Sequence, residues 1–287
     1  MLTGGPPDLG DRVHLPHYPG GRRRDGRRSL LIAIVSTVVV FGLLGWLVVS
    51  SPGWQLVQQS FFNPKYIGTS WPRQVAAVAV NVQLFLIAEA CIVPFGLLIA
   101  VLRSLPGPVF APVRAMAVVY TDIFRGVPSV LIIFLLGFGM PGLGVDWLVG
   151  DPFLWGVVAL VLVYSAYVSE VYRAGIESVH PSQTAAARSL GLTYLQAMRY
   201  VVIPQAVRRV IPPLLNDFIG LQKDTAFVSL IGVTEVFRQA QVDESASFNF
   251  TPYLVTAALF LILTVPLIHI TDWLVARDRR RLLAGVA

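Results

Sequence analysis

Long runs of apolar residues constrain this sequence more than any other feature. The first covers residues 30–49, and only Ser36 and Thr37 interrupt it. A helix needs about 20 apolar residues to cross the hydrocarbon core of a bilayer. Charged residues make up 13% of the 287-residue chain, about half of the roughly 25% that is usual for soluble domains. The pattern therefore predicts an all-α, polytopic membrane protein.

Five further apolar runs follow, so we expect six transmembrane helices. The fifth begins after Pro212-Pro213, because proline suits the first turn of a helix. The first run is too long for a signal peptide and lacks a good cleavage site at residues 50–53, so we interpret it as a retained helix. The predicted spans cover residues 30–49, 75–102, 113–139, 153–171, 212–231 and 253–275.

The arginines give the chain an orientation. Two of the 22 basic residues are lysines, Lys65 and Lys223, and the rest are arginines. If both termini are cytoplasmic, 17 arginines fall on the cytoplasmic side, whereas Lys65, Arg73 and Arg238 fall outside. Cytoplasmic loops of membrane proteins carry such an excess of basic residues. The net charge of +6 therefore mostly reflects the orientation of the chain in the membrane. The arginines are spread over four segments, which argues against the single basic patch of a nucleic-acid-binding protein.

Ionisable residues within spans are costly and usually face a protein interior or a wet cavity. Glu89 shares the second span with Asn81 and Gln83. These side chains fit hydrogen bonding between helices or a polar pathway equally well. In the third and fourth spans, Asp122 with Arg125, and Glu170 with Arg173, stand at i, i+3 spacing, which lets each pair neutralise itself.

The fifth span is the richest in polar residues. Asn216, Gly220 and Lys223 share one helical face, and Asp217 and Asp224 lie on an adjacent face. A Lys–Asp pair could be purely structural. Five such positions on one span nevertheless favour a cavity or a seam between subunits.

No catalytic or metal site is predicted. The four histidines lack the spacing of metal ligands, and no glycine-rich loop of the nucleotide-binding type is present. A single cysteine, Cys91, excludes a disulfide scaffold. We therefore expect no cofactor in this chain, and any energy for transport must come from a partner.

The longest cytoplasmic segment within the bundle, about residues 178–204, is patterned as a helix, a turn and a second helix. Pro181 and Ser182 are typical of a helix start, and Gly191 is suited to a C-terminal cap. We expect the second helix over about residues 194–202, ending before Pro204. Most connectors are about four to six residues long, so the length and pattern favour a docking element.

This segment resembles the EAA loop of type I ABC importer permeases. The matching pattern is Ala185-Ala186-Ala187, three residues, Gly191, nine residues and then Val201-Val202-Ile203-Pro204, and Leu190 and Leu192 flank the glycine as an apolar face. The resemblance covers about residues 72–275. Within the family, the matching stretches are similar to the polar amino acid (histidine/glutamine/arginine) subfamily. The other matching stretches are FRGVP at 124–128, YVSEVYRAGI at 167–176, IPQA at 203–206, KDT at 223–225, IGV at 231–233 and RQAQ at 238–241.

The resemblance implies a permease subunit that moves polar amino acids by alternating access. Implied partners are ABC ATPase subunits that use ATP, a second permease copy or a homologous permease, an extracytoplasmic substrate-binding protein, and the lipid of a bacterial plasma membrane. The loop would transmit ATPase motion to a five-helix core. Ala185 stands where the family usually has Glu, so docking would depend more on Gly191, Leu190 and Leu192.

The expected organisation runs from one cytoplasmic tail to another. It comprises a disordered Arg-rich tail (1–29), an extra helix (30–50), an extracytoplasmic segment (51–73), the transmembrane domain (74–276) and a basic tail (277–287).

The candidate substrate pathway holds residues of both charges, as an amino acid requires. These are Glu170, Asp217, Lys223, Asp224, Arg125 and Glu89. The acids could meet an ammonium or guanidinium group, and Arg125 or Lys223 a carboxylate. Alternatives remain open: a permease for another small zwitterionic or cationic solute, a secondary transporter, which should show an internal repeat, or a structural membrane subunit.

Overall fold

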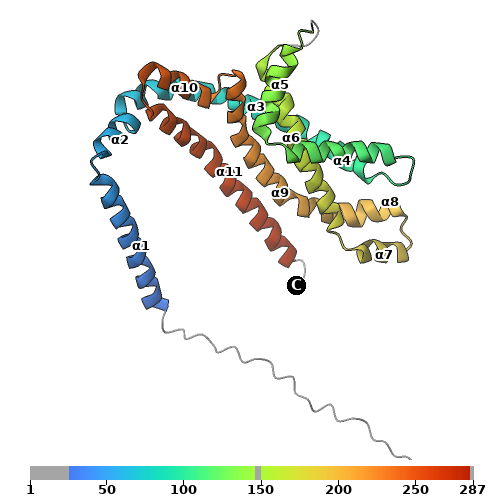
Figure 1. The fold of residues 1–287 in the computed structure, drawn as a ribbon. Helices are drawn as coiled ribbons and strands as arrows, with labels where there is room; N and C mark the ends of the chain where they lie inside the picture. Colours follow the sequence, from blue (N-terminus) through green and yellow to red (C-terminus); the bar gives the residue numbers. More distant parts are fainter. Residues whose placement is uncertain (1–25, 146–149, 285–287) are drawn as a thin grey trace, which may run out of the picture. The chain divides into compact units, whose positions relative to one another are not determined.

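All regular elements in the described part of the chain are helical, which confirms the predicted all-α class (Figure 1). The structure is a computed structural model that describes residues 26–145 and 150–284. It divides into two units, residues 1–56 and 57–287, which are treated separately below. The elements are α1 (Gly26–Val49), α2 (Trp54–Phe61), α3 (Pro64–Ser104), α4 (Ala111–Gly126), α5 (Ser129–Gly142), α6 (Pro152–Glu177), α7 (Pro181–Ser189), α8 (Tyr194–Ala197), a π-helical turn (Met198–Val202), α9 (Ile203–Asp224), a 3₁₀ helix (Thr225–Ile231), α10 (Val236–Ser247) and α11 (Thr251–Ala284).

The first unit contains α1, the predicted N-terminal span. Its apolar stretch is long enough to cross a membrane, and its side chains from Arg28 onward are exposed, as suits a helix surrounded by lipid. Most of the predicted N-terminal tail lies outside the described residues. Its last four residues, 26–29, already belong to α1.

In the whole described chain, four helices are long and apolar enough to cross a membrane, and the bent pair α4–α5 makes a fifth if it is one span. The prediction of one continuous helix over residues 113–139 is wrong, because α4 and α5 meet at an angle of 104°. The break falls at Val127-Pro128. Proline lacks an amide hydrogen and forces the residue before it out of the helical region, and Val127 has φ −93° and ψ 132°.

The fifth predicted span differs most from the structure. Instead of starting at Pro212-Pro213, α9 begins at Ile203 and holds both prolines inside it. It ends at Asp224 and passes into the 3₁₀ helix. Because its polar residues lower its hydropathy, α9 is not one of the helices in the described residues that meet the length and hydropathy of a span. The count of six therefore rests on the sequence interpretation of this segment.

Helix α6 lies at the centre of the second unit and packs against α3, α4, α5 and α9. The main apolar core includes the fully buried residues Leu84, Ile133 and Leu160. The approach of α9 depends on Gly175, because a Cβ there would lie 2.1 Å from Cγ2 of Val210. In Figure 1, α9 and α11 run beside each other, and α11 continues as helix through part of the predicted C-terminal tail.

The loop predicted to be cytoplasmic, about residues 178–204, contains the predicted helix–turn–helix. Helix α7 starts at Pro181, and Gly191 adopts a left-handed conformation with φ +90°, which glycine accepts without strain. Thr193 and Gln196 then form a capping box for α8. The expected end before Pro204 is wrong: the chain continues through the π-helical turn into α9. Pro204 sits in the first turn of α9, where a missing amide hydrogen costs little.

Candidate functional site: two adjoining pockets and a helix–turn–helix loop

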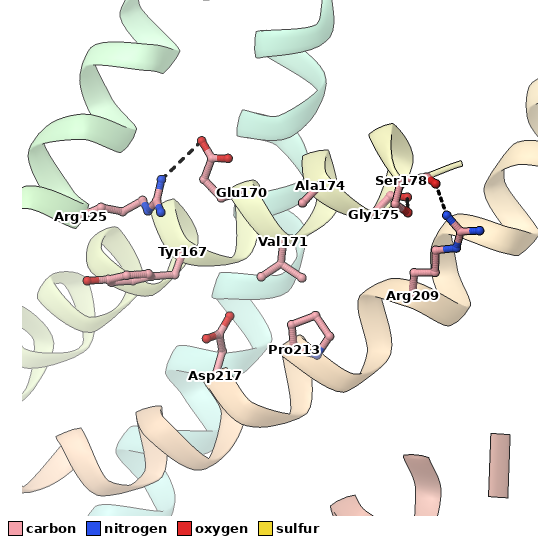
Figure 2. Close-up of a pocket in the computed structure, with 10 residues that line it drawn as sticks. All are labelled: Arg125, Tyr167, Glu170, Val171, Ala174, Gly175, Ser178, Arg209, Pro213 and Asp217. Carbon is pink, nitrogen blue, oxygen red and sulfur yellow. Dashed lines mark hydrogen bonds and ion pairs between the residues drawn. The ribbon is translucent and has the colours of Figure 1, made fainter. Parts of the chain in front are cut away.

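Two pockets lie in succession along α6 and α9. The first, here called the loop-side pocket, has a volume of about 440 Å³ (Figure 2). It is lined by Arg125, Tyr167, Glu170, Val171, Ala174, Gly175, Ser178, Arg209, Pro213 and Asp217. The second, the mid-helix pocket, measures about 200 Å³ and is lined by Ser129, Val163, Tyr164, Tyr167, Asn216, Asp217, Gly220 and Asp224. Tyr167 and Asp217 line both, so the two pockets adjoin.

Three arginines surround the carboxylate of Glu170 beside the loop-side pocket. Glu170 on α6 accepts hydrogen bonds from Arg103 of α3 and, at 2.8 Å, from Arg173. Arg125 of α4 approaches the same carboxylate at 3.5 Å, and Arg173 also pairs with Glu177. These five residues, called the Glu170 cluster below, tie α3, α4 and α6 together. The predicted Glu170–Arg173 pair is confirmed.

The i, i+3 spacing of Asp122 and Arg125 predicted an ion pair between them, and this prediction is wrong. No ion pair in the described chain joins them, and Arg125 instead reaches Glu170 and lies over the ring of Tyr167, with 5.8 Å from Cζ to the ring centroid. Figure 2 shows Arg125, Tyr167 and Glu170 together at one end of the pocket. Asp122 is exposed.

The acids of α9 differ in how they are held. Oδ2 of Asp224 accepts hydrogen bonds from Tyr164 at 3.0 Å and from Ser129 at 3.4 Å. Oδ2 of Asp217 is buried and has no hydrogen-bond partner in the described chain. The mid-helix pocket is therefore lined by one hydrogen-bonded carboxylate, Asp224, and by one carboxylate with an unpaired buried oxygen, Asp217.

The other two predicted pathway residues lie off the pockets. Lys223 is exposed, and it forms no ion pair with Asp224 among the described residues, where no salt bridge includes it. Glu89 is half-buried on α3 and lines neither pocket.

The contacts of Asn81 support hydrogen bonding between helices rather than a role in the polar pathway. Its side-chain amide donates to Thr225 and to Glu235, at 3.0 and 2.9 Å, and its oxygen accepts from the backbone of Val236. Glu235 also accepts from the backbone N–H groups of Phe237 and Arg238. Burial raises the pKa of Glu235, and these hydrogen bonds oppose the rise. The group, called the Glu235 network, links α3 to α10.

The loop predicted to be cytoplasmic presents an exposed apolar surface. Leu190 is 82% exposed and Leu195 is 78% exposed. Ala187 is buried and fixes α7 to the rest of the loop, whereas Ala185 and Ala186 are exposed. The remaining predicted loop residues comprise one partly buried side chain, Leu192, and two exposed residues, Gly191 and Pro204.

Sequence reasoning missed several lining residues. Tyr164, Tyr167 and Arg209 all contribute to the pockets. Tyr167 lies within a stretch that carried the family resemblance, which was the available signal. Arg209 was interpreted only as a marker of orientation, and its guanidinium donates to the backbone oxygen of Ser178. No cluster of three or more potential metal ligands occurs in the described part of the chain.

Comparison with known proteins agrees with this architecture. Residues 92–281 match the family described as binding-protein-dependent transport system inner membrane component. The probable glutamine ABC transporter permease protein GlnM of Bacillus subtilis (strain 168) is 39% identical over 173 residues, covering 60% of this chain and 77% of that protein. The arginine transport system permease protein ArtQ of the same organism is 38% identical over 165 residues, covering 57% and 74%.

A solved structure gives the same result. The crystal structure of an amino acid ABC transporter with histidines is 35% identical in sequence, with a TM-score of 0.67, and the match covers 72% of this chain and 94% of that one. The helical architecture and the matched family define a multi-pass membrane transport subunit. The chain belongs to the family of binding-protein-dependent transport system inner membrane components. The predicted resemblance to ABC importer permeases is confirmed.

Proposed function

We propose that this chain is the permease subunit of an ABC importer of polar amino acids in the bacterial plasma membrane. The observation that carries the substrate class is the pair of adjoining pockets, whose lining includes Arg125 and Arg209 as well as Glu170, Asp217 and Asp224. An amino acid has both charges and needs partners for both. The relatives named above as glutamine and arginine permeases support the same class.

Transport would be driven by ABC ATPase subunits docked on the cytoplasmic loop. The exposed leucine of this loop, Leu190, and the left-handed turn at Gly191 give a shaped apolar surface. The chain itself uses no cofactor, and its partner hydrolyses ATP. Ala185 is exposed and leaves the docking surface without the usual carboxylate, so the contact relies on shape and apolar burial.

The remaining partners complete the pathway. A second copy, or a homologous permease, would cover the exposed face of α9 that includes Lys223. A binding protein would deliver substrate on the extracytoplasmic side, and both termini would be cytoplasmic. In this arrangement Glu170, Asp217, Lys223, Asp224, Arg125 and Glu89 border the route of the substrate.

Uptake by proteoliposomes that contain the permease, its ATPase and its binding protein tests the proposal. Among a panel of radiolabelled amino acids, at least one should accumulate only when ATP is present on the side of the membrane where the ATPase lies. Gly191→Glu should abolish this uptake, because a side chain at φ +90° is strained and the new charge lies on the docking surface. Ser189→Ala on the same loop is the matched control and should transport normally.

Two results would overturn the proposal. Accumulation that needs an ion gradient and no ATP would assign the chain to secondary transporters. ATP-driven uptake of a different zwitterionic or cationic solute, with no amino acid accepted, would keep the ABC permease and reject the substrate class.

A further inference from the structure

We propose that Arg125 and Asp217 bind opposite ends of one zwitterion in the loop-side pocket, Arg125 its carboxylate and Asp217 its ammonium group. This inference rests on the proposed function and adds to it the orientation of the substrate. It assigns separate specificity roles to two side chains on α4 and α9.

The charges of the Glu170 cluster do not balance. Three guanidinium groups, from Arg103, Arg125 and Arg173, share the carboxylates of Glu170 and Glu177. One positive charge therefore remains without an equal partner inside the cluster. A surplus guanidinium beside a pocket is suited to an anionic group of a ligand, because its planar fork matches a carboxylate.

Arg125 is the arginine that carries this surplus. Its nitrogen lies 3.5 Å from Glu170, whereas that of Arg173 lies at 2.8 Å. Its side chain is 42% exposed, compared with 13% for Arg103. Arg125 also lines the pocket and lies over Tyr167. The ring and Glu170 hold the guanidinium in place while most of its five N–H donors stay available.

Arg209 is less suited to bind the carboxylate. Its guanidinium already donates to the backbone oxygen of Ser178. Figure 2 shows Arg125 and Arg209 at opposite ends of the pocket, with Asp217 on the α9 wall. Arg209 therefore closes the loop-side rim of the pocket. Arg125 remains the guanidinium with N–H donors available to a ligand.

Asp217 supplies the complementary charge. It lines the same pocket as Arg125, and its buried Oδ2 has no partner in the described chain. A carboxylate with a buried, unpaired oxygen is costly, and an ammonium group in the pocket would supply the countercharge that no described residue provides. Asp224 is a weaker candidate, because Tyr164 and Ser129 already donate to it.

Equilibrium binding to the purified permease–ATPase complex, without binding protein, tests the orientation. For L-glutamine the probes are 4-aminobutanamide, which lacks the carboxylate, and 4-carbamoylbutanoate, which lacks the ammonium group. If the uptake panel identifies another amino acid, its decarboxylated and deaminated analogues replace these two. Arg208→Gln is the matched control, because Arg208 is exposed beside Arg209 and lines neither pocket.

The expected pattern is crossed. Arg125→Gln should raise the Kd of the amino acid about tenfold or more, the effect of losing one charge-assisted hydrogen bond, and leave the Kd of the decarboxylated analogue unchanged. Asp217→Asn should raise the Kd of the amino acid similarly and leave that of the deaminated analogue unchanged. Arg208→Gln should change none of these constants.

Three outcomes reject the orientation. In the first, each variant weakens both analogues equally, which indicates a structural role. In the second, neither variant changes any Kd. In the third, the wild-type complex transports the amino acid but does not bind it without the binding protein. ATP-driven uptake by the wild-type protein is measured separately. If this uptake occurs, the three outcomes reject the orientation alone, and if it is absent, the proposed function fails.

Discussion

Two buried or half-buried glutamates tie α3 to other helices, and they do so by opposite means. Glu170 is held by three arginines and keeps a side chain that is 17% exposed. Glu235 is fully buried and is held by neutral donors, namely the amide of Asn81 and two backbone N–H groups.

The difference indicates different mechanical roles. Hydrogen bonds from neutral donors inside a protein are short-ranged and directional, and leaving one unmade is costly, so the Glu235 network fixes α10 against α3. Ion pairs at a partly exposed site can exchange partners and are screened by salt. The Glu170 cluster borders the loop-side pocket, where a transporter needs contacts that can be exchanged during its cycle.

The largest effect is expected from Glu235→Ala. The change leaves one of the two N–H bonds of the Asn81 amide, and the backbone N–H groups of Phe237 and Arg238, without an acceptor, while Asn81 keeps its bond to Thr225. The free energy of unfolding should fall by about 3 kcal/mol, since each unsatisfied buried donor costs about 1–3 kcal/mol. Thermal unfolding of the purified complex measures the loss. Glu244→Ala, at a partly exposed position of the same helix, is the control, and an equal drop in both variants would contradict the role of the network.

Glu170→Gln should have a smaller effect that depends on salt. It removes the charge shared by Arg103, Arg125 and Arg173, and we expect a loss of about 2 kcal/mol at low ionic strength. Since the cluster is partly exposed, the loss should shrink in high salt, whereas that of Glu235→Ala should not. Melting curves at two salt concentrations separate the cases.

The matched control for the Glu170 cluster is Glu177→Gln. Glu177 is 61% exposed and pairs only with Arg173 among the described ion pairs, so its loss should cost about 0.5 kcal/mol or less. If Glu170→Gln proves independent of salt, the contrast between an exchangeable and a fixed tie fails.

The pH dependence of stability should distinguish Glu235 from its neutral substitute. Burial raises the pKa of Glu235 in the folded chain, so the folded state holds this proton more tightly than the unfolded state. The resulting stability is fully present below the unfolded pKa, about 4.3, and is lost as the pH rises through the folded value. Relative to wild type, Glu235→Gln should therefore gain in melting temperature from about pH 4 to neutral pH. A constant difference would show that the folded pKa is not raised.

The sequence was sufficient for the class and for the loop. Apolar runs of about 20 residues leave little alternative to membrane helices, and the turn at Gly191 follows from the rarity of φ +90° in other residues. Glu170 and Arg173 on α6 were predicted to pair because their spacing places them on one helical face.

Two errors arose where tertiary packing decides, and a third came from a local signal that was overlooked. Pro212 and Pro213 favoured a helix start, yet α9 runs through them. Its earlier part packs on α6, where Val210 meets Gly175, and no local pattern shows that contact. Pro128 was included in one long apolar run, although its effect on Val127 could have predicted the bend. Arg125 has Asp122 as its near neighbour in sequence, but its partner is 45 residues away in Glu170.

The smallest effect is expected at Arg73, which also links α3 to α10. Its guanidinium lies 3.3 Å from Asp243, but its side chain is 56% exposed. Asp243 keeps a second hydrogen bond from Gln239 on its own helix, at 3.0 Å, so Arg73→Gln leaves the buried carboxylate partly satisfied. We expect a loss of about 1 kcal/mol or less, decreasing in high salt, in the same melting assay. A loss as large as that of Glu235→Ala would mean that charge, rather than the neutral network, holds α10 on α3, and both glutamate sites would then be ties of one kind.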